Sequence, residues 1–408
     1  MSQPAIPPRS AYPWYLTSSS LWMAGMSLQG FLFTWLLVGV LERPADEAGF
    51  ARALAEFPPL LVLLLGGVLG DRFNGRTYLG IMHTLIALPP LALILVYNQG
   101  WLGYWWVVLF GIAMASIQAL SDPSRQAILS RVARIDLQRA VTFMTVVTSL
   151  VGMTGIYLGG RLDVLGLPTL LAGQAILFLA GIFAVRRLPD LPPTHLAQPA
   201  RPPPNLTAGL KAAWKATMIR NIIALNFFSS LFNAGAYIIA IPYIAKEVYH
   251  GDAAFLATVM IVFTVGSIGS NALLLLFMPL KHPGRLFLIL QLSRMFILGI
   301  LWFQPSLWLF YLVMLAWGLN MGVTTTLVRT TVQELASDTY RAQILSVLLL
   351  SFVVSSPISS ILLGLLIAET TPLAAMLPGI VISLLIFIIG VTRSGLWGYS
   401  APGKPNPR

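Results

Sequence analysis

Residues 10–41 read SAYPWYLTSSSLWMAGMSLQGFLFTWLLVGVL, a stretch without Asp, Glu, Lys or Arg. A helix needs about 20 apolar residues to cross the hydrocarbon core of a bilayer, where charged side chains are costly. Similar stretches recur along the whole 408-residue chain, which is 57% hydrophobic and 10% charged. The sequence therefore predicts a polytopic, all-α membrane protein that has the lipid bilayer as its surroundings.

The spacing of charged clusters predicts twelve transmembrane helices. The turn signal Asn98-Gln99-Gly100 divides the apolar run 77–121 into two spans. The expected spans, in chain order, are 14–41, 52–70, 77–97, 101–121, 139–160, 165–186, 219–245, 253–280, 285–303, 306–328, 342–368 and 371–392.

A polar, proline-rich stretch separates these spans into two groups of six, as in transporters built from two repeats. Its composition predicts a semi-extended linker. Gly75-Arg76 after span two and Gly284-Arg285 after span eight support an internal repeat. The expected organisation is an N-terminal six-helix half (1–186), a linker (187–218), a C-terminal six-helix half (219–392) and a tail (393–408).

The distribution of positive charge predicts the orientation. If the N-terminus lies inside, twenty of the 25 Lys and Arg fall on cytoplasmic segments and four on outer ones. We therefore expect both termini in the cytoplasm, in an inner (plasma) membrane. The net charge of +11 then belongs to these loops, so no nucleic-acid partner is expected.

Composition also narrows the chemistry. The chain has no Cys and four scattered His, so we expect no disulfide, metal site or cofactor. A membrane enzyme would need His, Asp, Ser or Lys gathered at one membrane face, and the dense charged cluster after span two fits gating better. The sequence thus predicts a protein that is not an enzyme, with a non-transporting receptor as an open alternative.

That cluster reads Gly67-Val-Leu-Gly-Asp-Arg-Phe-Asn-Gly-Arg76. Gly67 and Gly70 allow a neighbouring helix to approach closely, and Gly75 permits a tight turn. The stretch resembles the G-x-L-x-D-R-x-G-R signature of the major facilitator superfamily, with Asn74 as one extra residue. The resemblance implies two six-helix halves that rock to give alternating access.

A second stretch, Asp122-Pro-Ser-Arg-Gln-Ala-Ile-Leu129, resembles the loop between spans four and five in the drug and siderophore exporter branch, which includes enterobactin exporters and macrolide efflux proteins. The resemblance implies that Asp71 caps span eleven and that Arg76 pairs with Asp122, closing the cytoplasmic side. The implied cytoplasmic gate comprises Gly67, Gly70, Asp71, Arg72, Gly75, Arg76, Asp122 and Arg125.

Span five departs from the antiporter pattern G-x-x-x-G-P-x-x-G-G. The matching stretch runs from Val151 to Gly160, with Val151 in place of the first Gly and Ile156 in place of Pro. The remaining glycines still allow close packing with a neighbouring helix.

Polar residues deep in the spans are the candidates for substrate binding, since transporter sites lie near the midplane between the repeats. Arg294 is the deepest charged group and either attracts an anionic substrate or pairs with an acid such as Glu334. The substrate candidates are Gln29, Gln118, Asn226, Asn233, Tyr237, Arg294 and Asn320.

Proton coupling is implied by the family, with Glu56, Asp71 and Asp122 as candidate carriers. Glu56 lies four residues after Arg52, so the two can also form a helical ion pair. Together with the apolar spans, the resemblance implies a monomeric secondary transporter that exports a hydrophobic or amphipathic small molecule by proton-coupled alternating access. A transporter of lysophospholipids or other lipids is the alternative.

Overall fold

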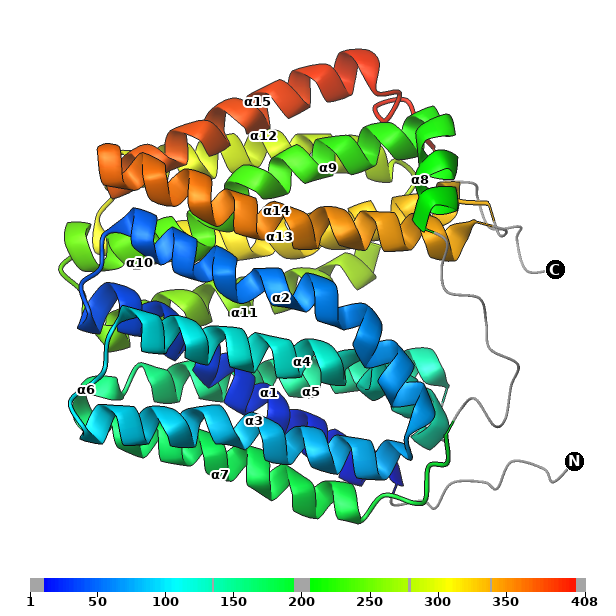
Figure 1. Cartoon of the computed structure of the whole chain (residues 1–408). Helices are drawn as coiled ribbons and strands as arrows, with labels where there is room; N and C mark the ends of the chain where they lie inside the picture. Colours follow the sequence, from blue (N-terminus) through cyan, green and yellow to red (C-terminus); the bar gives the residue numbers. More distant parts are fainter. Residues whose placement is uncertain (1–10, 134–135, 194–205, 278–279, 338–339, 401–408) are drawn as a thin grey trace, which may run out of the picture. The chain divides into compact units, whose positions relative to one another are not determined.

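Helices form all the regular structure in the part of the chain that the computed structural model describes, residues 11–133, 136–193, 206–277, 280–337 and 340–400. Within these residues, eleven helices are long and apolar enough to cross a membrane. The remaining expected span is helix α2 (Ala45–Arg72), whose side chains at 60 and 63–71 are not described. The all-α membrane architecture is confirmed (Figure 1).

The chain packs into two units that follow its two halves, apart from two short segments. Pro44–Phe50 packs with the second unit and Gly251–Thr258 with the first. The helices of the first half are α1 (Ala11–Trp35) with its π-helical continuation η1 (Leu36–Val40), α2, α3 (Gly75–Asn98), α4 (Tyr104–Val132), α5 (Leu137–Gly159), the short α6 (Leu162–Leu165) and α7 (Leu167–Arg186).

The second half repeats this order with one extra helix before its first span. Its helices are α8 (Leu206–Lys215), α9 (Thr217–Gly235) continued by η3 (Ala236–Ala240), α10 (Ile241–Tyr243) and η4 (Ile244–Val248), then α11 (Ala253–Phe277), α12 (Pro283–Trp302), α13 (Leu307–Leu335), α14 (Arg341–Glu369), the 3₁₀ turn η5 (Pro372–Ala375) and α15 (Met376–Arg393). The first span of each half thus passes from α-helix into π-helical turns, which are frequent at functional sites.

Two expectations about element bounds are wrong. Helix α4 continues to Val132 rather than ending near 121, because Ser121 and Arg125 find partners inside the first unit. The 187–218 linker is not semi-extended throughout, because Leu206–Lys215 forms helix α8. Ala213 of α8 is buried in an apolar cluster that contains Ile219.

Glycines of span five bring α5 against α1, as its sequence predicts. A methyl group on Gly155 would lie 2.3 Å from the carbonyl oxygen of Ala24 and 2.9 Å from the backbone nitrogen of Leu28. Methyl groups on Gly152 and Gly159 would also meet α1, at Ser27 and Phe31. The close approach of the two backbones therefore depends on the missing side chains.

Candidate functional site

The largest polar cluster inside the second unit surrounds Arg294. This side chain lies near the middle of α12 and is 1% exposed. Ser229, Gln291, Asn320 and Thr324 hydrogen-bond to it, and further polar residues lie three or four positions from Ser229 on α9. These residues are Asn226, Ser229 and Asn233 on α9, Gln291 on α12, and Asn320 and Thr324 on α13.

All five N–H groups of the Arg294 guanidinium meet acceptors. Nε and Nη2 donate to Asn320 Oδ1 over 2.9 and 2.6 Å. Nη1 donates to the Ser229 hydroxyl over 2.7 Å and more weakly to Gln291 Oε1 over 3.5 Å. Nη2 also donates to the Thr324 hydroxyl over 3.2 Å. Because every acceptor is neutral, the positive charge is held without a carboxylate.

The expected alternative of an Arg294–Glu334 ion pair is therefore wrong. Glu334 Oε2 instead accepts a hydrogen bond from the Tyr399 hydroxyl over 3.3 Å. The cost of burying a cation is met here by hydrogen bonds alone, which is the more expensive arrangement. Such a charge in a membrane protein is a functional candidate by default.

Several buried polar atoms on α9, α12 and α13, the helices that supply the Arg294 cluster, have no partner among the described residues. They are the donors Asn226 Nδ2, Gln291 Nε2 and Trp317 Nε1 and the acceptor Asn233 Oδ1. The four side chains are 0–3% exposed, so water does not reach them from the surface. Unpaired buried polar atoms are costly and call for a ligand or ordered water. Three of the four are donors, which suits a ligand rich in acceptors.

Aromatic rings lie next to this polar group. Tyr237, carried by the π-helical η3, stacks on Phe263 of α11 with ring centroids 4.1 Å apart. Trp317 of α13 meets both rings edge to face, at 6.1 and 5.9 Å. The second unit therefore joins a cationic, donor-rich group to an aromatic surface.

The first unit has a separate buried cluster around Arg125 and His83. Arg125 Nε donates to the Ser121 hydroxyl over 2.9 Å, and Nη2 lies 3.0 Å from His83 Nε2. Its guanidinium carbon sits 3.9 Å from the centre of the Trp22 ring. Arg125 was expected in a gate loop, whereas the structure places it in a helix and in the interior.

The partners of His83 determine its protonation. Its Nδ1 lies 2.9 Å from the Phe178 carbonyl oxygen, which can only accept, so Nδ1 carries the proton. Its Nε2 faces Arg125 Nη2, which can only donate, so Nε2 must be an unprotonated acceptor. The Ser18 hydroxyl lies 2.9 Å from the same nitrogen. His83 is thus a neutral structural acceptor rather than a proton carrier.

The loop after α2 is organised by the residue that is additional to the family signature. Asn74 caps α3, accepting from the backbone N–H groups of Arg76 and Thr77, and its Nδ2 donates to Asp190 over 2.6 Å. Arg76 Nη1 donates to the Leu188 carbonyl over 3.3 Å, not to Asp122 as the resemblance implies.

Of the remaining gate residues, some lie among the described residues and others do not. Arg72 ends α2, and a methyl group on Gly75 would lie 3.0 Å from Ile128, so α3 starts close to α4. The side chain of Asp71 and the surroundings of Gly67 and Gly70 lie outside the described residues.

Other expected residues belong to the first unit. Gln29 is buried on α1, and Gln118 lies on α4 one helical turn before Asp122. Glu56 pairs with Arg52, with Nε and Oε1 2.6 Å apart, and its Oε2 is buried without a partner among the described residues.

The sequence predicts Asn226, Asn233, Arg294 and Asn320 as candidates but not Ser229 and Gln291, which hydrogen-bond to Arg294. A signal was present, because Ser229 lies three residues after Asn226 and Gln291 three before Arg294. Polar residues at these spacings share one helix face.

Comparison with known proteins identifies a family and several structural neighbours. The family model described as the Major Facilitator Superfamily matches residues 15–359. A mutant of the nucleoside transporter NupG superposes with a TM-score of 0.77 at 14% identity, covering 93% of this chain and 99% of that one. A D-xylose-proton symporter gives 0.68 at 14%, covering 94% and 97%.

A bacterial homologue of the human lysosomal transporter Spinster, in an inward-facing and unoccupied conformation, gives a TM-score of 0.64 at 13% identity. The alignment covers 96% of this chain and 97% of that one. No curated protein sequence matches the chain. At such identities the structural likenesses establish the fold and leave the substrate open.

Proposed function

The chain belongs to the Major Facilitator Superfamily of membrane transporters, and on this premise we propose that it moves an amphipathic small molecule bearing an anionic or acceptor-rich group. The cluster around Arg294 carries the proposal. It holds a buried cation on neutral acceptors beside three unpartnered donors. An anionic group would balance the charge and satisfy donors together, and either effect is strong in a medium of low dielectric.

The apolar part of the proposed substrate follows from the aromatic surface. Tyr237, Phe263 and Trp317 offer rings that bind flat, hydrophobic groups, and Tyr and Trp suit ligands with one apolar and one polar end. A cationic amphipath would instead meet the uncompensated charge of Arg294 without a carboxylate to offset it. We therefore propose selection against cations.

Export coupled to proton entry is the proposed mode of transport, and it rests on the exporter resemblance. Glu56 and Asp122 supply carboxylates within the transmembrane helices, and Glu56 keeps one oxygen buried without a partner among the described residues. His83 is excluded as a carrier by its hydrogen bonds.

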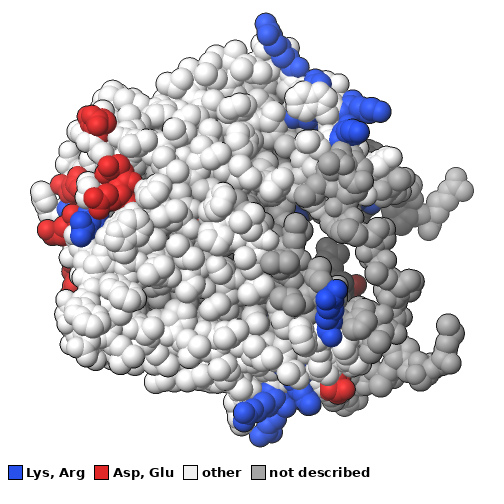
Figure 2. Space-filling view, viewed as in Figure 1, with Lys and Arg blue, Asp and Glu red and all other residues white. Residues whose placement is uncertain are grey.

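The proposed orientation places both termini in the cytoplasm of a cell with a plasma or inner membrane. In each unit, Lys and Arg gather where its last long helix, α7 or α15, ends, while acidic residues lie at the opposite end of the second unit (Figure 2). Positive charge near span ends favours the cytoplasmic side. The transporter is proposed to work as a monomer.

A lysophospholipid is the second candidate substrate. Its phosphate would suit the donor-rich cluster and its single acyl chain the aromatic rings, so the site geometry serves both candidates. The two differ in coupling, because lipid movement needs no proton exchange.

The test is transport in proteoliposomes with an imposed pH gradient. One fluorescent amphipath is prepared with a carboxylate, an amide or an amine in the same position, and labelled lysophospholipid forms a further arm. We expect the carboxylate form to move at least about tenfold faster than the amine, because one strong charge-assisted contact contributes about 1.5 kcal/mol or more. Proton flux should accompany it and disappear in Asp71→Asn.

Equal rates for the three head groups, or preference for the amine, would overturn the anionic substrate class. Lysophospholipid movement without proton flux would favour the second candidate.

A further inference from the structure

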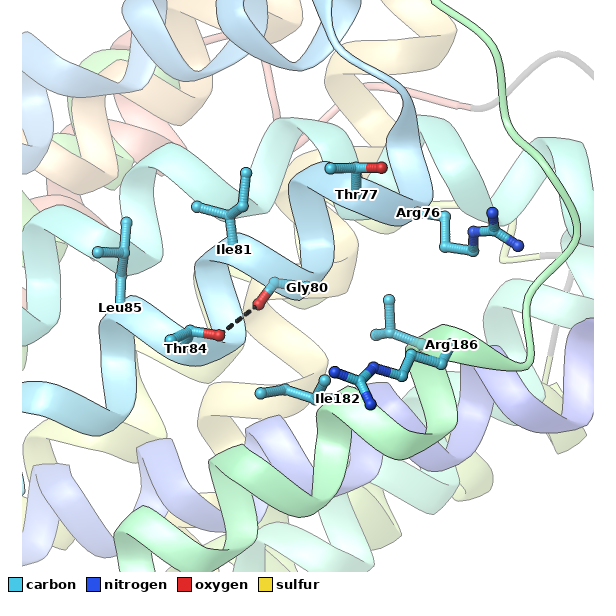
Figure 3. A pocket seen from close by; sticks show the side chains of 9 residues that line it. Arg76, Thr77, Gly80, Ile81, Thr84, Leu85, Ile182 and Arg186 are labelled. Carbon is cyan, nitrogen blue, oxygen red and sulfur yellow. Dashed lines mark hydrogen bonds between the residues drawn. The ribbon is translucent and has the colours of Figure 1, made fainter.

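We propose that a groove on the surface of the first unit, between α3 and α7, binds an anionic phospholipid, with the lipid phosphate at Arg76 and Arg186. The groove has a volume of about 650 Å³, within the range of ligand sites. Figure 3 shows both arginines at one end and Ile81 and Leu85 toward the other. This inference is independent of the proposed substrate.

The two arginines are available to bind an anion. Arg76 uses one guanidinium N–H on the Leu188 carbonyl, over 3.3 Å. Arg186 ends α7 and forms no hydrogen bond or ion pair with another described residue. Asp190 is occupied by Asn74. Most of the ten guanidinium N–H donors at this end are thus free, and arginine forks match phosphate oxygens well.

The remainder of the groove suits an acyl chain. Ile81 and Leu85 are 46% and 37% exposed and follow each other by one helical turn. The hydroxyl of Thr84 donates to the Gly80 carbonyl, so its proton needs no acceptor on a ligand (Figure 3). A methyl group added to Gly80 would meet no atom within 4 Å, so the wall of the groove is hollow at this position.

The depth of these residues matches a lipid molecule. Arg76 is the second residue of α3, so it lies at the membrane edge, where head groups lie. Leu85 lies nine residues further along the span, about 14 Å deeper at 1.5 Å per residue. An ordered lipid would therefore place its phosphate at the arginines and its upper chain against Ile81 and Leu85. Basic groups at this level attract anionic lipids.

The experiment titrates the delipidated, full-length protein in detergent with phosphatidylglycerol and counts bound lipid by native mass spectrometry. We expect one saturable lipid whose affinity falls about 10- to 100-fold in Arg76→Gln/Arg186→Gln, which corresponds to a loss of about 1.4–2.7 kcal/mol for the two side chains together. The double variant Arg187→Gln/Arg393→Gln has the same net charge and should bind as the parent does. Both of its residues are exposed and outside the groove.

A second pair of variants tests the hollow without changing charge. Gly80→Phe should fill the groove and abolish the saturable lipid, whereas Gly173→Phe on α7 should not. Both glycines face open space, so both variants should fold.

Three outcomes would overturn the proposal. They are equal affinity for phosphatidylcholine, displacement of the lipid by millimolar inorganic phosphate, and unchanged binding in the Arg76→Gln/Arg186→Gln variant. The second would indicate a site for free phosphate rather than for a lipid.

Discussion

The buried charge of Arg294 lowers the stability of the fold, so its presence calls for a functional explanation. Its charge is buried among neutral acceptors, and replacing a buried charge by a neutral group is often harmless to stability. Residues kept despite such a cost are commonly functional. The hydrogen bonds of Arg294 show how the charge is held, and the proposed anionic substrate gives that charge a function.

We predict that Arg294→Gln changes the free energy of unfolding by less than about 2 kcal/mol, because the desolvation cost of the charge disappears and offsets the hydrogen bonds that Asn320, Ser229 and Thr324 lose. Transport of the carboxylate probe should fall at least about tenfold. Thermal unfolding in detergent and initial rates in proteoliposomes measure the two effects. Arg294→Lys keeps the charge and should keep the preference for anions, and loss of that preference would contradict a role for the charge.

His83 has the opposite character, because its hydrogen bonds are structural. We predict that His83→Ala lowers the free energy of unfolding by about 3 kcal/mol or more. The variant leaves a cavity and deprives Arg125 Nη2 and the Phe178 carbonyl of their partner. Denaturant unfolding in micelles measures the change. His282→Ala at an exposed position should cost less than about 0.5 kcal/mol, and equal losses would contradict the assignment.

At the scale of elements, the close contact between α1 and α5 depends on glycine. We predict that Gly155→Ala destabilises the first unit by about 1–3 kcal/mol, because the new methyl group would meet the Ala24 carbonyl at 2.3 Å and backbone atoms cannot give way. Gly30→Ala, where the new methyl group meets open space, is the matched control. Thermal unfolding of both variants measures the difference, and similar melting temperatures would show that the helices separate at little cost.

The sequence predicts the bounds of a helix well where charged residues lie at the ends of that helix. Spans such as 285–303 and 342–368 agree with α12 and α14 within two residues. The rule failed for α4, because Arg125 is a charge that the fold buries, and for α8, because a ten-residue amphipathic helix is too short to stand out as a span beside the prolines that precede it.

Prediction of the candidate site was partial for a related reason. Deep polar residues are visible in the sequence, and one of the predicted ones, Asn320, hydrogen-bonds to Arg294. Which neighbour satisfies the guanidinium depends on packing between α9, α12 and α13. Glu334 was therefore a reasonable partner by charge and a wrong one by position.

At the scale of the molecule, the two halves place polar residues on corresponding helices. The first, third and fourth spans supply Ser18, His83 and Arg125 in one unit, and Ser229, Arg294 and Asn320 in the other. Each cluster contains a buried arginine held largely by neutral groups. This correspondence supports the internal repeat and gives both interiors a positive character.

The orientation of the whole chain can be tested directly, because it contains no Cys. We predict that Gln99→Cys and Val164→Cys, in exposed turns between spans three and four and between five and six, react with a membrane-impermeant maleimide in intact cells. Arg187→Cys and Arg393→Cys should react after permeabilisation, because positive charge holds their loops inside. All four positions are exposed, so accessibility within the protein does not limit labelling. The reversed labelling pattern would place Arg76 and Arg186 in the outer leaflet. It would also place the proposed gate on the outer side of the membrane instead of the cytoplasmic side.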